Sequence, residues 1–217
     1  MARRALTTTA TALTIAASFL LTGCGGGDDS SSGDIKGADT GAGSPSASAS
    51  TSTASSDVKR PVITLPSSFK LTFENWTSGD GEERAVLNDA REELRAGYAA
   101  IIANDPDSKA VAFYDTEGVI RQTKKWIKSY TDKNVTVIGA LPAFDPKVTM
   151  ASTGDGASLT YCTDESQAKT KNRKTGEVLG NPAGTDPEVA YVVSLAKSAQ
   201  GVWQNTSVSS KRGGCSK

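Results

Sequence analysis

Cysteine thiols are the most reactive side chains of this 217-residue chain, which has three of them. Cys24 follows Leu21-Thr22-Gly23 at the end of an apolar run, and Cys162 and Cys215 lie in the second half of the chain. A thiol can be acylated, oxidised to a disulfide or bound to a metal. The chain has no histidine, which removes the commonest general base, the commonest transition-metal ligand and every Ser-His or Cys-His nucleophile pair.

The segment before Cys24 has the features of an export signal with a lipid-attachment site. Two arginines, Arg3 and Arg4, precede an apolar run over 5–21 that is too short, and too rich in Thr and Ala, to span a bilayer. In bacterial lipoproteins, which this segment closely resembles, the signal is cut before the cysteine and the thiol carries a diacylglyceryl group. The resemblance implies a signal peptide over 1–23, lipid attachment at Cys24 and a position on the extracytoplasmic face of the cell membrane. A free secreted protein is the alternative.

Cys162 and Cys215 remain as a pair in that oxidising compartment, so a disulfide is the natural inference. Two free buried thiols are the competing interpretation, and metal ligation by two cysteines without histidine is much less favoured. The disulfide would join the C-terminal tail to a strand in the middle of the domain. In the chain-entropy model, closing a loop of about fifty residues contributes roughly 4 kcal/mol.

Charge composition argues against a nucleic-acid partner and against a cofactor. The 24 basic and 24 acidic residues give a net charge of 0, and no block of like charge is long enough to act as a nucleic-acid arm. Asp28-Asp29 and Gly154-Asp155-Gly156 have too few oxygens at calcium-loop spacing to indicate a metal site. The expected partners are therefore the membrane, through the N-terminal lipid, and a small apolar ligand or an envelope protein.

Composition also divides the mature chain into two parts. Residues 24–60 are mostly Gly, Ser, Thr, Ala and Asp, which cannot bury enough surface to offset the entropy of ordering, so a lipid-anchored flexible linker is predicted there. Residues 61–217 are long enough to close a single hydrophobic core. One folded domain is expected, and its oligomeric state is left open, with a dimer as one option.

Three helices are predicted in the first half of the domain. The strongest begins after Asp80, which can cap it, and its apolar residues recur at spacings of three and four, while Asp89 and its charged neighbours are expected to face solvent. A short helix follows Asp105-Pro106. The third carries one apolar stripe over 119–130, and its basic residues form a solvated face.

After Asp132 the pattern changes to alternation and β-branched residues, which predicts strands. The expected strands cover 135–141, 147–152, 157–163, 188–198 and 202–209, with 167–172 as a further, polar candidate. Pro142 and Asp145-Pro146 are expected to separate the first two. Helices followed by a meander of strands indicate an α+β domain with the helices on one face of an antiparallel sheet.

Three helices followed by a long, bent antiparallel sheet is the order of elements in the NTF2-like (cystatin-related cone) superfamily, which this chain resembles. The chain also resembles a family of small lipoproteins from high-GC Gram-positive bacteria, through short segments distributed over most of 61–215. They are the lead-in to Trp76, Ala112-Phe113-Tyr114, Lys147-Val148-Thr149, Tyr161-Cys162-Thr163-Asp164, Arg173-Lys174-Thr175-Gly176-Glu177-Val178 and Gly201-Val202-Trp203-Gln204. The first resemblance implies a sheet curved into a cone whose mouth holds a small apolar ligand, an active site or nothing.

Aromatic side chains are the candidates for lining such a cone, although packing alone also explains them. The candidates are Tyr98, Trp126, Tyr130, Tyr161 and Trp203. Enzymes of the superfamily often use an Asp, Tyr or His that faces into the cone. In this chain the nominal equivalents are Tyr114, Asp115, Tyr130, Tyr161 and Asp164. A place in the core, a turn or a solvated strand end accounts for each of these more simply than catalysis does.

Three functions are compatible with the sequence. The preferred one is a non-catalytic module that binds a small apolar ligand or an envelope protein, because no catalytic constellation is recognisable. The alternatives are a cone-shaped, SnoaL-like isomerase, hydrolase or lyase and a structural accessory subunit of an envelope complex. An enzyme predicts at least two inward polar side chains that converge, a binder predicts an apolar pocket with one or two polar anchors, and a structural subunit predicts a closed cone.

Overall fold

Helices and strands are largely segregated along the chain, as the sequence predicts. The computed structural model describes residues 58–215, in which the helices are α1 (Gly81–Ala103), α2 (Lys109–Tyr114) and α3 (Glu117–Thr131). The strands are β1 (Phe69–Phe73), β2 (Val135–Met150), β3 (Gly156–Asp164), β4 (Ala168–Asn172), β5 (Val178–Leu179), β6 (Glu188–Lys197) and β7 (Trp203–Arg212). The signal segment, Cys24 and nearly all of the linker lie outside the described residues, so what the sequence predicts for them stays a prediction.

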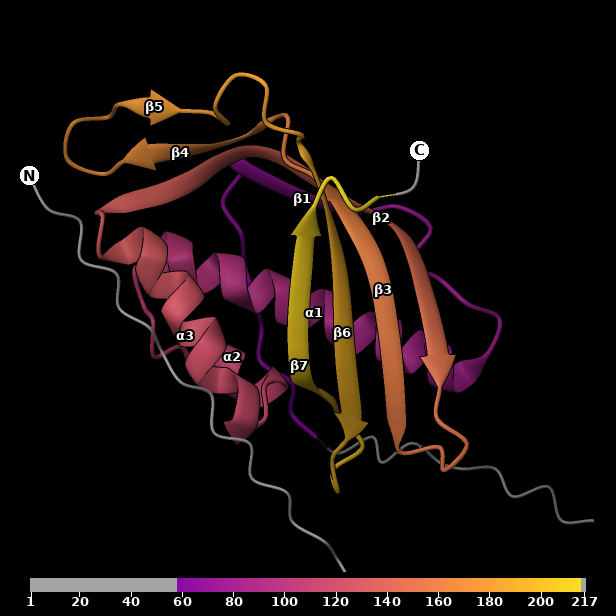
Figure 1. The fold of residues 1–217 in the computed structure, drawn as a ribbon. Coiled ribbons are helices and arrows are strands. Elements are labelled where there is room, and N and C mark those ends of the chain that lie inside the picture. Colours follow the sequence, from indigo (N-terminus) through magenta and orange to yellow (C-terminus); the bar gives the residue numbers. More distant parts are fainter. Residues whose placement is uncertain (1–57, 216–217) are drawn as a thin grey trace, which may run out of the picture. The chain divides into compact units, whose positions relative to one another are not determined.

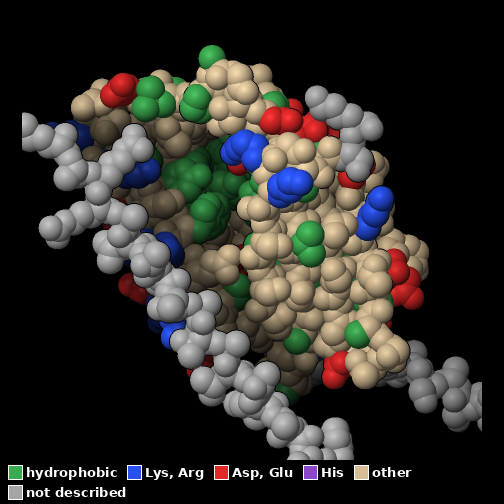
Figure 2. All heavy atoms as spheres, viewed as in Figure 1, with side chains coloured by type: hydrophobic (Ala, Val, Ile, Leu, Met, Phe, Trp, Pro, Cys, Tyr) green, Lys and Arg blue, Asp and Glu red, His purple; other side chains and the backbone are tan. Residues whose placement is uncertain are grey.

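The strands form one curved sheet in the order β5-β4-β2-β3-β6-β7, and β1 is added parallel to β2. The remaining pairs are antiparallel. The three helices cover one face of this sheet, with α1 crossing the strands (Figure 1). Figure 2 shows that the molecule is hollowed between α3 and β7. The fold-class prediction is confirmed, because three helices lie on a curved antiparallel sheet as in an NTF2-like cone.

Strand β2 corrects one sequence-based expectation, since it is continuous where two strands were predicted. Pro142 lies between the part of β2 that pairs with β4 and the part that pairs with β3, and its other edge faces β1. Gly139 donates its N–H toward β1, and the N–H groups of successive residues in a strand point to opposite edges, so an N–H at position 142 would point away from β1 and its absence breaks no ladder bond. Asp145 has a φ of 50° and takes up the register shift between Phe144 and Lys147 as a bulge. A long strand can therefore pass through both prolines.

Gly139 allows β2 to bend where it passes between β1 and β4. Its φ is 93°, which L side chains rarely adopt, and a Cβ at this position would collide with the carbonyl oxygen of Gln167. The bend curves the sheet around the helices and leaves space on its concave face. Glycine is thus required here by both conformation and close approach.

Helix α1 begins and ends as its sequence indicates. The Asp80 side chain accepts hydrogen bonds from the backbone N–H groups of Glu82 and Glu83, at 2.8 and 2.9 Å, and Asn104 ends the helix in the left-handed conformation. Among residues 58–215 no helix combines the length and the apolar character needed to cross a membrane.

Asp89 does not face solvent as the helical pattern predicts, but is only 2% exposed. Its carboxylate accepts hydrogen bonds from Arg60 at 2.9 and 3.0 Å and from the backbone N–H of Trp203 at 2.9 Å. The lead-in before β1 and the start of β7 are both tied to α1 through this one side chain. Periodicity alone could not reveal the burial, because both partners come from distant parts of the chain.

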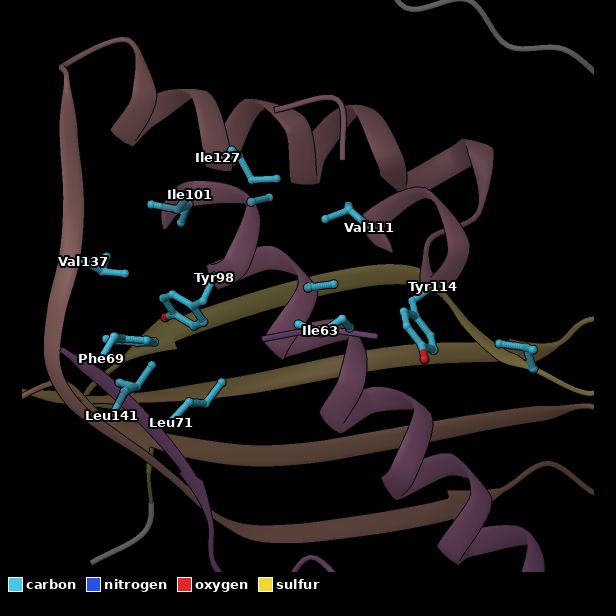
Figure 3. Close-up of a cluster of buried hydrophobic side chains, with 13 residues drawn as sticks. Ile63, Phe69, Leu71, Tyr98, Ile101, Val111, Tyr114, Ile127, Val137 and Leu141 are labelled. Atoms are coloured by element: carbon cyan, nitrogen blue, oxygen red, sulfur yellow. The ribbon is translucent and has the colours of Figure 1, made fainter. Parts of the chain in front are cut away.

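The core lies between the helices and the concave face of the sheet. Figure 3 shows one of its clusters, in which Ile63 and strand β1 bring apolar side chains against α1. The Phe69 and Tyr98 rings lie 5.0 Å apart there. A second cluster places Trp76 against Tyr161, with ring centroids 5.2 Å apart. The core therefore fills the space between helix and sheet near both ends of α1.

Replacing Gly97 with alanine is expected to lower the free energy of unfolding by about 1–3 kcal/mol, as overpacking usually does. An added Cβ would meet the Trp126 ring at 2.8 Å, where α1 packs on α3. The gain in helix propensity, about 1 kcal/mol, offsets this only in part. Urea unfolding of Gly97→Ala beside Gly118→Ala, where the added Cβ meets nothing closer than 3.9 Å, checks the expectation. Equal stability of the two variants would contradict it.

Cys162 and Cys215 are joined in the structure, with their Cα atoms 6.1 Å apart. The predicted disulfide therefore links β3 to the segment after β7, within the distance range that disulfides allow. The bond closes a loop with a sequence separation of 53 residues and holds the C-terminal segment against the sheet.

The variant Cys215→Ser is expected to lose about 4 kcal/mol of stability, because the unfolded chain regains the freedom that the closed loop removes. Urea unfolding of this variant should match that of the wild-type protein in a reductant. Peptide mapping under non-reducing conditions provides the second readout. Recovery of both cysteines as free thiols from native protein would contradict the bond.

Candidate functional site

A cavity of about 180 Å³ opens on the concave side of the sheet. Its walls come from α1 and α3 on one side and from β3, β6 and β7 on the other. Hydrophobic side chains lie deep in the hollow that Figure 2 shows. The lining residues are Glu93, Leu94, Tyr98, Gln122, Thr123, Trp126, Tyr161, Tyr191, Val193, Val208 and Ser210. The cone is therefore open, although the rest of its interior is packed.

Four aromatic rings contribute to the cavity wall. Tyr98 and Trp126 meet edge to face with ring centroids 5.3 Å apart, and Tyr161 and Tyr191 stack with centroids 4.9 Å apart. The first pair comes from the helices and the second from the sheet, so the space between them is flanked by π-systems. Such walls suit flat apolar groups and also cations, which are attracted to ring faces.

Glu93 is the carboxyl group of the cavity. Burial and, to a smaller extent, the charge of Asp115 raise its pKa to about 8, and the Asn205 amide opposes this rise. A carboxyl group with such a pKa is mostly protonated at neutral pH. Glu93 can therefore donate a hydrogen bond or a proton to a bound molecule, or accept a proton after ionisation.

Asp115 lies beyond Glu93, between α2 and α3, and is 4% exposed. Burial raises the pKa of its carboxyl to about 6, and the side chains of Thr123 and Asn205 lower it in part. Neither of its oxygens makes a hydrogen bond of ordinary geometry within the described chain. Two carboxyl groups with separated pKa values thus act on each other here, Glu93 in the cavity wall and Asp115 outside it.

Other buried polar atoms near Asp115 lack partners as well. Asn205, which forms a β-bridge with Asp115, has an unpaired Oδ1, and Tyr114, the residue before Asp115, has an unpaired hydroxyl. The Trp203 indole N–H, two residues before Asn205 on β7, is also unpaired among residues 58–215. Buried polar groups are nearly always bonded to protein or ordered water, so unpaired ones mark places where water or a ligand completes the network.

The structure distributes the predicted lining residues over three places. Tyr98, Trp126 and Tyr161 line the cavity. Tyr130 lines a separate, smaller cavity of about 90 Å³ beside β4, to which Tyr98 also contributes. Trp203 is 1% exposed and packs in the core, because its strand position faces α1 rather than the opening.

The nominal acids and bases are also dispersed. Asp115 and Tyr114 are buried, as described above, whereas Asp164 lies at the end of β3 and accepts a hydrogen bond from the Ser166 backbone. Tyr161 lines the cavity with its pKa raised by burial and by the nearby charges of Tyr191 and Glu93. Tyr161 thus shares the cavity with Glu93, and Asp115 acts on Glu93 through its charge.

Glu93 itself is absent from the sequence-based candidates, although a signal for it exists. Val86, Ala90, Gly97 and Ala100 are buried along α1 at spacings that put Glu93 in the middle of their stripe. A carboxyl group on a stripe of small apolar residues is unusual. The small neighbours also explain the cavity, since they leave space that larger side chains would fill.

No group of three His, Cys, Asp or Glu side chains that could hold a metal ion occurs within residues 58–215. The carboxyl pair therefore has too few protein ligands for a dedicated metal site of the usual kind.

No protein-family model matches the chain, and no curated protein matches it either. Solved structures are similar to part of the chain. A ketosteroid isomerase-like protein from Erwinia carotovora atroseptica SCRI1043 is 18% identical, with 61% of this chain and 97% of that chain covered and a TM-score of 0.43. ActVI-ORFA from Streptomyces coelicolor is 11% identical, with 61% and 96% covered and a TM-score of 0.41.

The intermembrane space region of the chloroplast protein ARC6 is similar to the same extent. It is 10% identical, with 63% of this chain and 99% of that chain covered and a TM-score of 0.41. Identities and scores this low concern the path of the backbone alone. Proteins with unrelated functions share a fold, so activity has to be argued from the site itself.

Proposed function

We propose that this domain is a non-catalytic module that binds a small, mainly apolar molecule in the cavity between α3 and the sheet. The observation that supports the proposal is an open cavity with aromatic walls and a single carboxyl group, Glu93. Apolar pockets with one or two polar anchors are typical of binding sites. A structural accessory role would instead favour a closed cone.

The size of the cavity limits the ligand. An apolar protein cavity of about 150 Å³ holds benzene, so about 180 Å³ suits a single ring with a short substituent. A polar group on that substituent would point toward Glu93, because the remaining walls are largely aromatic or aliphatic. Affinity for such a small molecule is expected to be modest, since each heavy atom contributes at most about 1.5 kcal/mol.

Benzyl alcohol is a suitable neutral probe, and ligand-observed NMR can measure its binding. The variant Val208→Trp places a large ring in the cavity and is expected to abolish saturable binding. Val192→Trp is the matched control, because Val192 is 46% exposed on neighbouring β6 and does not line the cavity. Binding that is absent from the wild-type protein, or equal in both variants, would overturn the proposal.

Acid-base catalysis is a second candidate, favoured by one observation. The pKa values of Glu93 and Asp115, about 8 and about 6, are separated as in sites where one carboxyl donates and another accepts a proton. In its ionised form, whose share grows as the pH approaches 8, Glu93 should act as a base and exchange hydrogens next to the carbonyl of a bound ketone such as phenylacetone. Deuterium exchange that is faster with wild-type protein than with Glu93→Gln would favour an isomerase or lyase. Equal exchange rates for the two proteins would favour the non-catalytic binding module.

We also propose that the domain is held at the extracytoplasmic face of the membrane by lipid on Cys24. Cys24→Ala is expected to remain unlipidated, either retained as a precursor or released into the medium, while the domain from Pro61 onward folds unchanged. Two acyl chains suffice for stable anchoring, at about 0.8 kcal/mol per buried methylene. Mass spectrometry of the N-terminal peptide checks this. A wild-type N-terminus without the mass of a lipid would contradict the anchor.

A further inference from the structure

We propose that the molecule bound in this cavity is an organic amine in its charged form, with its apolar part between the aromatic walls and its ammonium group directed at Glu93. The inference rests on the proposed binding function and names the class of ligand. Its support comes from the charge of the cavity, the chemistry of its walls and the unpaired acceptors at its inner end.

The ionisable side chains that line the cavity are Glu93 and three tyrosines, so any charge that the cavity wall carries is negative. Glu93 is a carboxylic acid, whereas no lysine or arginine among the described residues lines the cavity. Arg212, whose charge acts on Tyr191 in the cavity wall, is already paired with Glu165. Arg60 and Lys197 are engaged in the same way, with Asp89 and Glu82. A bound cation would supply the charge that the protein itself does not place there.

The groups that face Glu93 come from three other elements, and none of them is a cation. Asp115 lies in the connection between α2 and α3, Tyr161 on β3 and Asn205 on β7. Thr123 and Gln122 line the cavity from α3 and are neutral. The polar groups of the cavity wall near Glu93 are therefore neutral hydroxyl and amide groups, and Asp115 adds negative charge from outside it.

The walls fit the same chemistry. Tyr98, Trp126, Tyr161 and Tyr191 flank the cavity, and the faces of such rings attract ammonium groups. A carboxylate ligand would gain nothing from these walls and would be repelled by Glu93. An alcohol would find hydrogen bonds but would gain neither the cation–π contacts nor a charge-assisted bond to ionised Glu93.

The unpaired atoms behind Glu93 are mostly acceptors. Both Asp115 oxygens and the Asn205 Oδ1 lack donors within residues 58–215. An ammonium group is all donor, with three N–H bonds and no acceptor. Asp115 does not line the cavity, so it would act on the ligand through its charge, while Glu93 makes the direct contact.

Benzylamine and benzyl alcohol form a matched pair of probes, since they differ only in the charged group. At pH 7 the amine is expected to bind about tenfold tighter or more, from the combined cation–π and charge-assisted contacts. Glu93→Gln should bring the two affinities within about twofold of each other. Glu92→Gln is the control, because the neighbouring Glu92 pairs with Arg95 and does not line the cavity.

Proton release gives a readout that a merely structural effect would not move. The ammonium group favours the ionised form of Glu93, whose proton is largely bound at pH 7 because its pKa lies at about 8. Calorimetry in two buffers of different ionisation enthalpy should detect nearly one proton released per benzylamine bound by the wild-type protein. With Glu93→Gln the release should nearly vanish. Only Asp115, whose pKa lies at about 6, could still release a small fraction of a proton.

The outcomes separate this inference from the proposed function. If benzyl alcohol binds as tightly as benzylamine to wild-type protein, or if benzoate binds tightest, the amine assignment is overturned while the binding function stands. If none of the three probes binds, both fail. Preference for the amine that survives Glu93→Gln would also overturn the inference, because the recognition would then lie elsewhere.

Discussion

Replacing Arg60 with alanine is expected to lower the free energy of unfolding by about 3 kcal/mol, because it leaves a buried carboxylate without its cation. Asp89, the partner of Arg60, has a side chain that is 3% exposed, whereas 42% of the Arg60 side chain is in contact with solvent. Water that replaces the guanidinium can reach the carboxylate in part. The loss should therefore fall at the lower end of the range for broken buried pairs.

A second substitution tests whether the charge is the cause. Asp89→Asn in the Arg60→Ala background retains an acceptor for the Trp203 backbone N–H and removes the uncompensated charge. The double variant should then be more stable than Arg60→Ala alone. Urea unfolding at neutral pH measures both, with the exposed neighbour Lys59→Ala as the control. A loss below about 1 kcal/mol for Arg60→Ala would show that the pair contributes no more than a surface salt bridge.

Stability is also expected to fall as the pH rises from about 5 to about 8, by roughly 2–4 kcal/mol. Burial raises the pKa of Glu93 from 4.5 to about 8, so the folded protein retains a proton that the unfolded chain releases throughout this interval. The folded state then binds more protons than the unfolded state, and stability decreases with pH. Asp115 adds to the decrease between about pH 4 and about pH 6, because its pKa is raised from 3.8 to about 6 on folding.

The magnitude follows from about 1.4 kcal/mol for each pH unit between the ordinary pKa of Glu93 and its raised pKa in the folded protein. We reduce the resulting free energy because Glu93 borders an open cavity, where solvent screens its charge. Glu93→Gln should flatten the pH dependence and raise stability at pH 8, since the amide never ionises. Glu92→Gln should keep the slope of the wild-type protein. Urea unfolding at three pH values gives these slopes. Parallel slopes for the two variants would show that Glu93 is not protonated in the folded state.

The local elements of this domain were determined by the sequence itself. Spacings of three and four around Leu87 and Ala90, with Asp80 as cap, predict α1, and alternation predicts β3, β6 and β7 close to their observed bounds. These signals are local, because each depends on which side of one element faces the core. The pairing of Cys162 with Cys215 also followed from composition, since few partners were available.

Tertiary structure alone decided the character of the site. The sequence pattern placed Asp89 in solvent and did not mark Glu93. In the fold, Arg60 and Trp203 come from distant segments and make Asp89 a buried ion pair. Burial and the charge of Asp115 make Glu93 a group that retains its proton. Hydrogen bonds, desolvation and charge depend on distance in space. A sequence pattern describes the side of a helix on which a carboxyl lies, and the fold decides what surrounds it.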